Sequence, residues 1–195
     1  VVGRRCRARV AAVQRVMHVV AERIGQRDLG GTGGAVALVL HAHLERRLRI
    51  ADVHRLILDS DVFINVPVLK HHSSTHLSIA MKNLMGVVKN RMTYHLSGLD
   101  QCIADFCLYK KPDLNIVDAY RVLMSDGPDG PRDAREANVL LKKTLLMSRD
   151  IVAVDAAATR IFGGNPEDIG YIKIGHRQRT GNMNLSKLNI VTYSM

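Results

Sequence analysis

The chain has 195 residues, of which 47% are hydrophobic and 24% charged, a composition typical of one globular domain. It excludes collagen, low-complexity disorder and a coiled coil. The chain has three cysteines, Cys6, Cys102 and Cys107, and no two of them have CxxC spacing. They are too few for a four-thiolate zinc site or a self-contained 4Fe-4S cluster. No apolar run reaches the roughly 18 residues of a membrane-spanning helix.

The net charge of +10 is concentrated in the N-terminal quarter. Residues 1–50 contain ten Arg, no Lys and three acidic residues, whereas residues 51–195 contain nine Lys, nine Arg and fifteen acidic residues. Composition leaves two interpretations of residues 1–50 open: a basic helical region, or sequence foreign to the fold, such as an out-of-frame start. Arg15, His18 and Arg23 interrupt the apolar stretch that a signal peptide would need, so we expect a cytoplasmic protein.

Hydrophobic periodicity predicts alternating helices and strands. Residues 16–24 fit either type. The predicted helices are amphipathic runs and cover residues 35–50, 51–58, 74–88, 99–109 and 148–164. The predicted strands are β-rich runs bounded by turn residues. Two cover residues 61–69 and 112–120, a third lies within 137–148, and a fourth ends the segment 185–195. This alternation predicts a single α/β domain with a mainly parallel sheet flanked by helices.

Polar residues follow several of the predicted strands. In a parallel sheet, ligands bind outside the carboxyl ends of the strands. Lys70, His71 and His72 follow one strand, Asp118 and the turn-rich segment 124–134 follow the next, and Ser148, Arg149 and Asp150 follow a third. We therefore expect these side chains to border one crevice.

Several segments resemble a known protein family. They are INVPVLKHH (64–72), KNLMG (82–86), Tyr94-His95, LNIVDAY (114–120), DGPDG (126–130) and DIVAVD (150–155). Together they resemble the DUF362 family, α/β proteins of unassigned chemistry that are often joined to ferredoxin-like 4Fe-4S modules. The resemblance covers roughly residues 50–195, so we divide the chain into a doubtful segment, 1–50, and a DUF362-like domain, 51–195. It implies that any 4Fe-4S cluster belongs to a partner polypeptide.

Two lysines and one aspartate are the main candidates for chemistry. Lys70 follows a strand and is suited to bind a carboxylate or phosphate, although a solvated loop lysine has the same pattern. Lys82, in the Lys-Asn pair typical of the resembled family, is either a surface side chain or the partner of a buried carboxylate. Asp155 is the best such carboxylate, because its neighbours in VAVDAAA are apolar or small.

Two histidines are candidate metal ligands. His72 and His76 lie four residues apart, which is the spacing of one helical turn, and Asn83 would lie on the same helix face. A third ligand is not evident, and an exposed polar face explains the same spacing. Tyr94 and His95 are a candidate proton-donating pair, or structural and solvated residues.

The DGPDG segment is a candidate ligand loop. Gly127 and Gly130 allow the backbone to approach a ligand, and the turn directs Asp126, although such turns are common without any chemistry. The full expected crevice comprises Lys70, His72, Lys82, Asn83, Asp118, Asp126 and Asp155.

We favour an enzyme that binds an anionic small molecule, with Lys70, His72, Lys82 and Asp155 as catalytic residues, and that works in iron–sulfur-linked redox metabolism. Its reaction class does not follow from the sequence. One alternative is a non-catalytic domain that binds a metal or docks a ferredoxin-like protein. A basic RNA-associated protein is another, which requires residues 1–50 to be genuine.

Overall fold

The computed structural model describes residues 35–39, 48, 50–131, 133 and 138–193. The prediction for residues 16–24 lies outside them. The predicted helix 35–50 is wrong where it is described, because β1 (Ala35–Val39) and β2 (Ile50–His54) form an antiparallel two-stranded sheet. Leu48 is 1% exposed and belongs to the hydrophobic core, so packed structure begins before residue 51.

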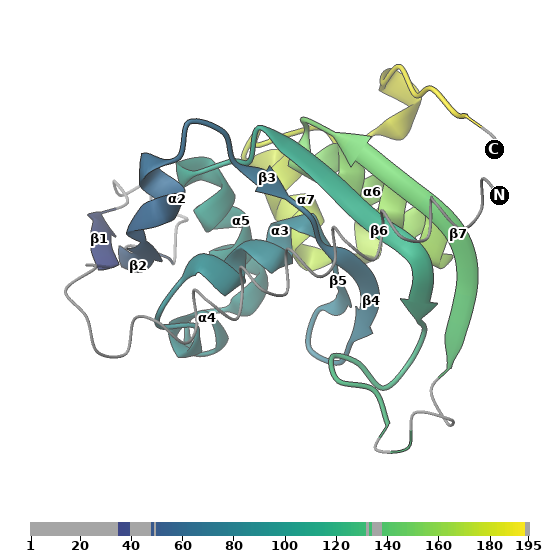
Figure 1. Cartoon of the computed structure of the whole chain (residues 1–195), viewed down its shortest axis with the longest axis horizontal. Coiled ribbons are helices and arrows are strands. Elements are labelled where there is room, and N and C mark those ends of the chain that lie inside the picture. Colours follow the sequence, from purple (N-terminus) through teal and green to yellow (C-terminus); the bar gives the residue numbers. More distant parts are fainter. Residues whose placement is uncertain (1–34, 40–47, 49, 132, 134–137, 194–195) are drawn as a thin grey trace, which may run out of the picture.

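A second sheet of five strands forms the larger part of the fold (Figure 1). Its central strand is β6 (Leu114–Leu123), and β3 (Ile64–Asn65) and β4 (Val68–His72) both pair with it in parallel. Antiparallel strands form the two edges: β5 (His76–Ser78) beside β4, and β7 (Val139–Ser148) beside β6. The predicted α/β domain with a helix-flanked sheet is confirmed.

Helices cover one face of this sheet, with α6 behind β6 and β7 in Figure 1 and α7 packed against α5 and α6. The helices are α2 (Arg55–Asp59), α3 (Ala80–Asn83), α4 (Met92–Leu96), α5 (Leu99–Tyr109), α6 (Ile151–Phe162) and α7 (Gly170–Arg177), with short 3-10 turns η1 (Leu84–Val87), η3 (Pro166–Asp168) and η4 (Leu185–Lys187). The predicted α6 is confirmed because its ends are locally encoded. Asp150 caps the N-terminal N–H groups, and Gly163 takes the left-handed conformation at the other end.

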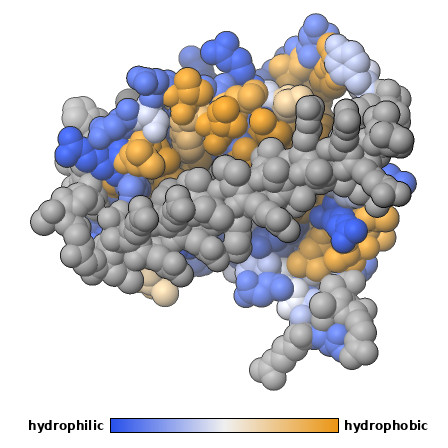
Figure 2. Space-filling model, viewed as in Figure 1, coloured by the Kyte–Doolittle hydropathy of each residue, from blue (hydrophilic) through white to orange (hydrophobic). Residues whose placement is uncertain are grey.

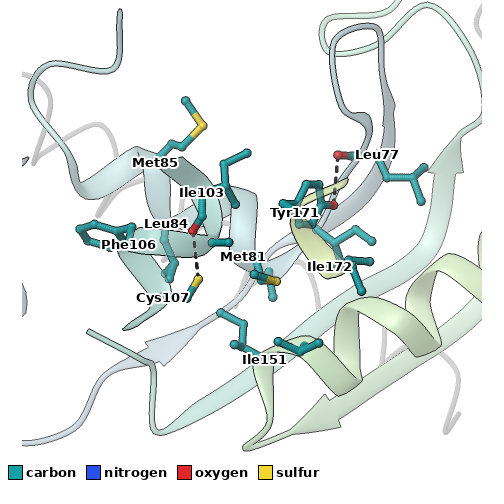
Figure 3. Packing of buried hydrophobic residues seen from close by; sticks show 14 of the residues in the cluster. Leu77, Met81, Leu84, Met85, Ile103, Phe106, Cys107, Ile151, Tyr171 and Ile172 are labelled. Carbon is teal, nitrogen blue, oxygen red and sulfur yellow. Dashed lines mark hydrogen bonds between the residues drawn. The ribbon is translucent and has the colours of Figure 1, made fainter. Parts of the chain in front are cut away.

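The hydrophobic core lies between the sheet and α3, α5, α6 and α7 (Figure 3). The Tyr171 hydroxyl donates to the Leu77 carbonyl oxygen at 3.2 Å and joins α7 to β5. Gly175 allows α7 to approach closely, since a Cβ there would lie 2.8 Å from Met81 and 3.1 Å from Val152. Hydrophobic periodicity did not predict α7.

The other face of the sheet carries exposed apolar residues. Leu145 and Met147 lie on this side of β7, because Leu146 between them packs against the core, and each is more than half exposed. Hydrophobic residues are visible on this view of the surface (Figure 2). These apolar side chains therefore lie on a face of the sheet that the described helices do not cover.

The predicted helix 74–88 is wrong at its N-terminal end. The chain turns at Ser73–Thr75 and returns as β5, with His72 opposite His76. His76 takes a φ of 61°, which ends any continuous helix there. Only α3 and η1 are helical, so Leu77 enters the core from a strand and Met81 from a helix.

Two more predictions are corrected. Residues 51–58 form the end of β2 and then α2 rather than one helix. The segment 185–195 was predicted to end in a strand, but η4 is followed by irregular chain over 188–193. Because β7 is antiparallel to β6, Ser148 pairs with Asn115 at the start of β6, and Arg149 and Asp150 follow at that end, away from Lys70.

Candidate functional site

The loop after β6 docks onto the β4–β5 hairpin. The Lys70 ammonium donates to the carbonyl oxygen of Pro128 at 2.8 Å, and the backbone N–H of Gly127 donates to His71 Nδ1 at 3.1 Å. Ser73 N–H donates to the Gly127 carbonyl oxygen at 3.2 Å. A Cβ at Gly127 would collide with the His71 carbonyl group, so this close approach requires glycine. The structure thus brings together two segments that the sequence placed at one crevice.

His72 is buried and neutral. Its Nδ1 accepts a hydrogen bond from the Ser74 backbone N–H at 3.1 Å, which leaves Nε2 to carry the ring proton. Burial, together with the charges of Lys82, Lys70 and His95, lowers its pKa to about 4. At neutral pH, therefore, His72 is a hydrogen-bond donor without a charge.

Lys82 is partly buried on α3. Burial and then the charge of Lys70 lower its pKa, and Asp100 opposes this. The charge of Lys70 therefore acts on Lys82, although 11 residues and a hairpin turn separate the two in the chain. We call Lys70, His72, Lys82 and His95 the basic cluster.

Asp100 borders this cluster and was not predicted. Burial raises its pKa, whereas a hydrogen bond from the Tyr171 backbone N–H and the charges of His76, Lys173 and Lys82 lower it. Its Oδ1 is buried and has no hydrogen-bond partner among the described residues. In the sequence Asp100 reads as an ordinary acidic residue in the first turn of α5, and no signal distinguishes it.

Asp155 is fully buried, as predicted, but the expected pair with Lys82 is wrong. Its two carboxyl oxygens accept hydrogen bonds from the backbone N–H groups of Ala80, at 2.8 Å, and Met81, at 3.0 Å. Burial raises its pKa to about 8 against these two hydrogen bonds. The first N–H groups of a helix need acceptors, and they replace the cation that we expected. Asp155 positions α3, which carries Lys82, and lies out of reach of a ligand in this structure.

Asn83 is exposed and belongs to a network with the buried Asn65 and Asn115 rather than to the basic cluster. Its amide donates to Asn65 Oδ1 at 2.8 Å, Asn65 donates to Asn115 Oδ1 at 3.0 Å, and Asn115 donates to the Ser148 carbonyl oxygen at 3.3 Å. Asn65 also donates to the Ala80 carbonyl oxygen at 3.0 Å. The sequence carried a signal for Asn65 and Asn115, since each is a polar residue within an apolar strand run.

The helical argument for a metal site is wrong. His72 and His76 are partners across a hairpin, not residues one helical turn apart. His72 is buried with Nδ1 already bonded, while His76 is exposed. Within the described part of the chain, no group of three or more His, Cys, Asp or Glu residues is arranged to hold a metal ion.

The side chains of the neighbouring residues Tyr94 and His95 lie in different environments. Tyr94 is 1% exposed, and its pKa is raised by burial and by Cys107, Cys102 and Asp105. The exposed His95 instead contributes to the field around His72. Of this pair, therefore, only the histidine belongs to the basic cluster.

The remaining predicted residues shape the backbone. Asp118 is buried beside Val68 and Leu145, and its Oδ1 accepts from the Tyr120 N–H at 2.9 Å. Asp126 is exposed with a φ of 58°, and its carbonyl oxygen accepts from the Gly130 N–H at 2.9 Å. These residues fix the end of β6 and the loop that reaches Lys70.

Comparisons with known proteins identify the family. The chain is 31% identical over 122 residues to the thylakoid-associated protein sll1697 of Synechocystis sp. (strain ATCC 27184 / PCC 6803 / Kazusa), a match covering 57% of this chain and 36% of that relative. The match thus spans about a third of the relative's length. No solved structure matches the chain. No helix in the described ranges is long and apolar enough to cross a membrane. The family described as Domain of unknown function (DUF362) matches residues 8–160, and the chain belongs to this family.

Proposed function

We propose that the basic cluster binds a small molecule carrying a carboxylate or phosphate group. The observation that carries this proposal is that the three basic side chains lie near one another: the Lys70 charge, after burial, lowers the pKa of Lys82, and both lysines lower that of His72. Like charges held together in a partly buried place raise the free energy of the empty site. A bound anion offsets that repulsion.

His72 complements the two lysines. Its Nε2–H is available as a neutral donor, because Nδ1 is bonded to the Ser74 N–H. A neutral donor next to two ammonium groups adds direction without adding charge, which favours an oxyanion over a halide. In an enzyme, the same three groups would polarise a bound carboxylate or phosphate. We propose such an enzyme, with Lys70, Lys82 and His72 in contact with the substrate.

The proposed redox context needs a partner. Cys102 and Cys107 are both buried, and burial raises the pKa of the Cys107 thiol. Thiols that resist ionisation make poor cluster ligands. We therefore propose that electrons, where the reaction uses them, come from a separate 4Fe-4S protein. Ferredoxin docking without catalysis, RNA association and a cytoplasmic location stay predictions of the sequence.

Titration of the purified chain with sulfate, phosphate and mono- and dicarboxylates, followed by calorimetry, tests the site. We expect at least one oxyanion to bind, and Lys70→Met and Lys82→Met each to weaken it about tenfold, as loss of one charge-assisted contact predicts. Lys187→Met is the matched control, because Lys187 is exposed on η4. Equal affinity in all three variants would refute the proposal.

A further inference from the structure

Asp100 borders the basic cluster, but α7, which carries none of the cluster residues, holds its carboxyl group. The backbone N–H of Tyr171, at the start of α7, donates to its carboxyl group. A Cβ on the neighbouring Gly170 would collide with this carboxyl group, so α7 lies directly against it. The carboxyl group is thus fixed from one side by a helix end.

The other side of the carboxyl group lacks hydrogen bonds. Oδ1 is buried and has no partner among the residues that the structure describes. The cationic or titratable groups that act on it are His76 on β5, Lys173 on α7 and Lys82 on α3. An ionised oxygen buried without a donor is costly, and these charges offset that cost only through space.

We propose that anion binding at the basic cluster is coupled to the uptake of one proton by Asp100. This inference rests on the proposed function. An anion beside Lys82 places a second negative charge near Asp100 and neutralises the cation that now favours its ionised form. It also brings no donor to the buried Oδ1, so the neutral carboxylic acid becomes the more stable form.

The raised pKa of Asp100, caused first by burial, agrees with this coupling, because it places the carboxyl closer to protonation before any anion arrives. Asp155 is not an equivalent candidate. Both of its oxygens already accept backbone hydrogen bonds, and Lys82 is not among the groups that shift its pKa. Asp100 is therefore the carboxyl group through which an anion at Lys82 acts.

Sulfate is the suitable probe, because it stays a dianion from pH 5 to pH 8. Calorimetric titration of the full chain in buffers of different ionisation enthalpy counts the protons taken up with each sulfate ion. We expect an uptake approaching one proton within this range and an affinity that falls at least about fivefold as the pH rises. The proton count needs no variant and so does not depend on the folding of one.

Variants show which residue takes up the proton. Asp100→Asn keeps an oxygen for the Tyr171 N–H, and we expect it to abolish most of the uptake and to bind sulfate more tightly than wild type at pH 8. His76→Asn should keep the Asp100 proton and gain no affinity at pH 8. Asp113→Asn, at the far end of β6 from Lys70, is the control and should match wild type.

The outcomes separate the two proposals. Sulfate, phosphate and carboxylates that all fail to bind would refute the proposed function and this inference with it. Sulfate that binds without proton uptake would refute the inference alone. Uptake that persists in Asp100→Asn and disappears in His76→Asn or His95→Asn would also refute it, because the proton would then belong to a histidine.

Discussion

Asp155 Oδ1 accepts a hydrogen bond from the backbone N–H of Ala80 at 2.8 Å, across 75 residues of sequence. The bond ties the middle of α6 to the first turn of α3, and α3 carries Lys82. Asp155, the most buried carboxyl group among the predicted site residues, therefore acts on the basic cluster indirectly. By holding α3 in place, it positions the ammonium group of Lys82.

Replacing Asp155 with Asn should destabilise the fold. An amide presents one acceptor where the carboxyl presents two, so the N–H of Ala80 or Met81 loses its partner in the core. We expect the free energy of unfolding to fall by about 1–3 kcal/mol, measured by denaturant titration. Asp61→Asn, at an exposed position, is the control and should change stability by less than about 0.5 kcal/mol.

His72 should make the fold less stable in mild acid. Its pKa is about 4 in the folded chain, against 6.5 ordinarily, so between these values the unfolded chain binds a proton that the folded chain does not. Stability is then lost as the pH falls from about 6.5 to about 4. His72→Asn offers Oδ1 to the Ser74 N–H in place of Nδ1 but does not titrate. Its unfolding free energy should fall less over this interval, and an equal fall in both proteins would contradict the prediction.

The part of the fold that could be predicted from sequence is the part encoded locally. The ends of α6 follow from Asp150 and Gly163, which act on neighbouring backbone groups. Segment 74–88 failed because Leu77, Met81 and Leu84 fit a helical period, while pairing with β4 decided the structure of its first residues. That pairing is a long-range contact that periodicity does not contain.

In the candidate site, too, some features could be predicted from the sequence and others depend on long-range contacts. Lys70 and the DGPDG loop were placed together by a general rule about parallel strands, and they meet. Asp100 could not be predicted, because its importance comes from α7 and from an oxygen that has no hydrogen-bond partner in the described part of the chain. The partner of Asp155 was misassigned because backbone N–H groups at a helix start are invisible in a residue pattern.

Asn65 should be among the residues least tolerant of truncation. It is 2% exposed and bonds to Asn83, Asn115 and the carbonyl oxygen of Ala80. Asn65→Ala would remove the donor to two buried acceptors, Asn115 Oδ1 and the Ala80 carbonyl oxygen, so we expect a loss of about 2–4 kcal/mol in the free energy of unfolding. Asn90→Ala, at an exposed position, should be nearly neutral in the same denaturant titration. Similar losses in both variants would mean that the network contributes nothing specific.

Gly127→Ala should separate the DGPDG loop from the β4–β5 hairpin. The new methyl group would collide with the His71 carbonyl group, and relieving the collision breaks the bonds from Gly127 N–H to His71 and from Lys70 to Pro128. Lys70 would then lose its fixed position, so we expect sulfate affinity to fall together with thermal stability. Gly86→Ala is the matched control, because a Cβ there meets nothing within 4 Å. If Gly127→Ala bound sulfate as tightly as Gly86→Ala while melting at a lower temperature, the loop would stabilise the hairpin without positioning Lys70 for an anion.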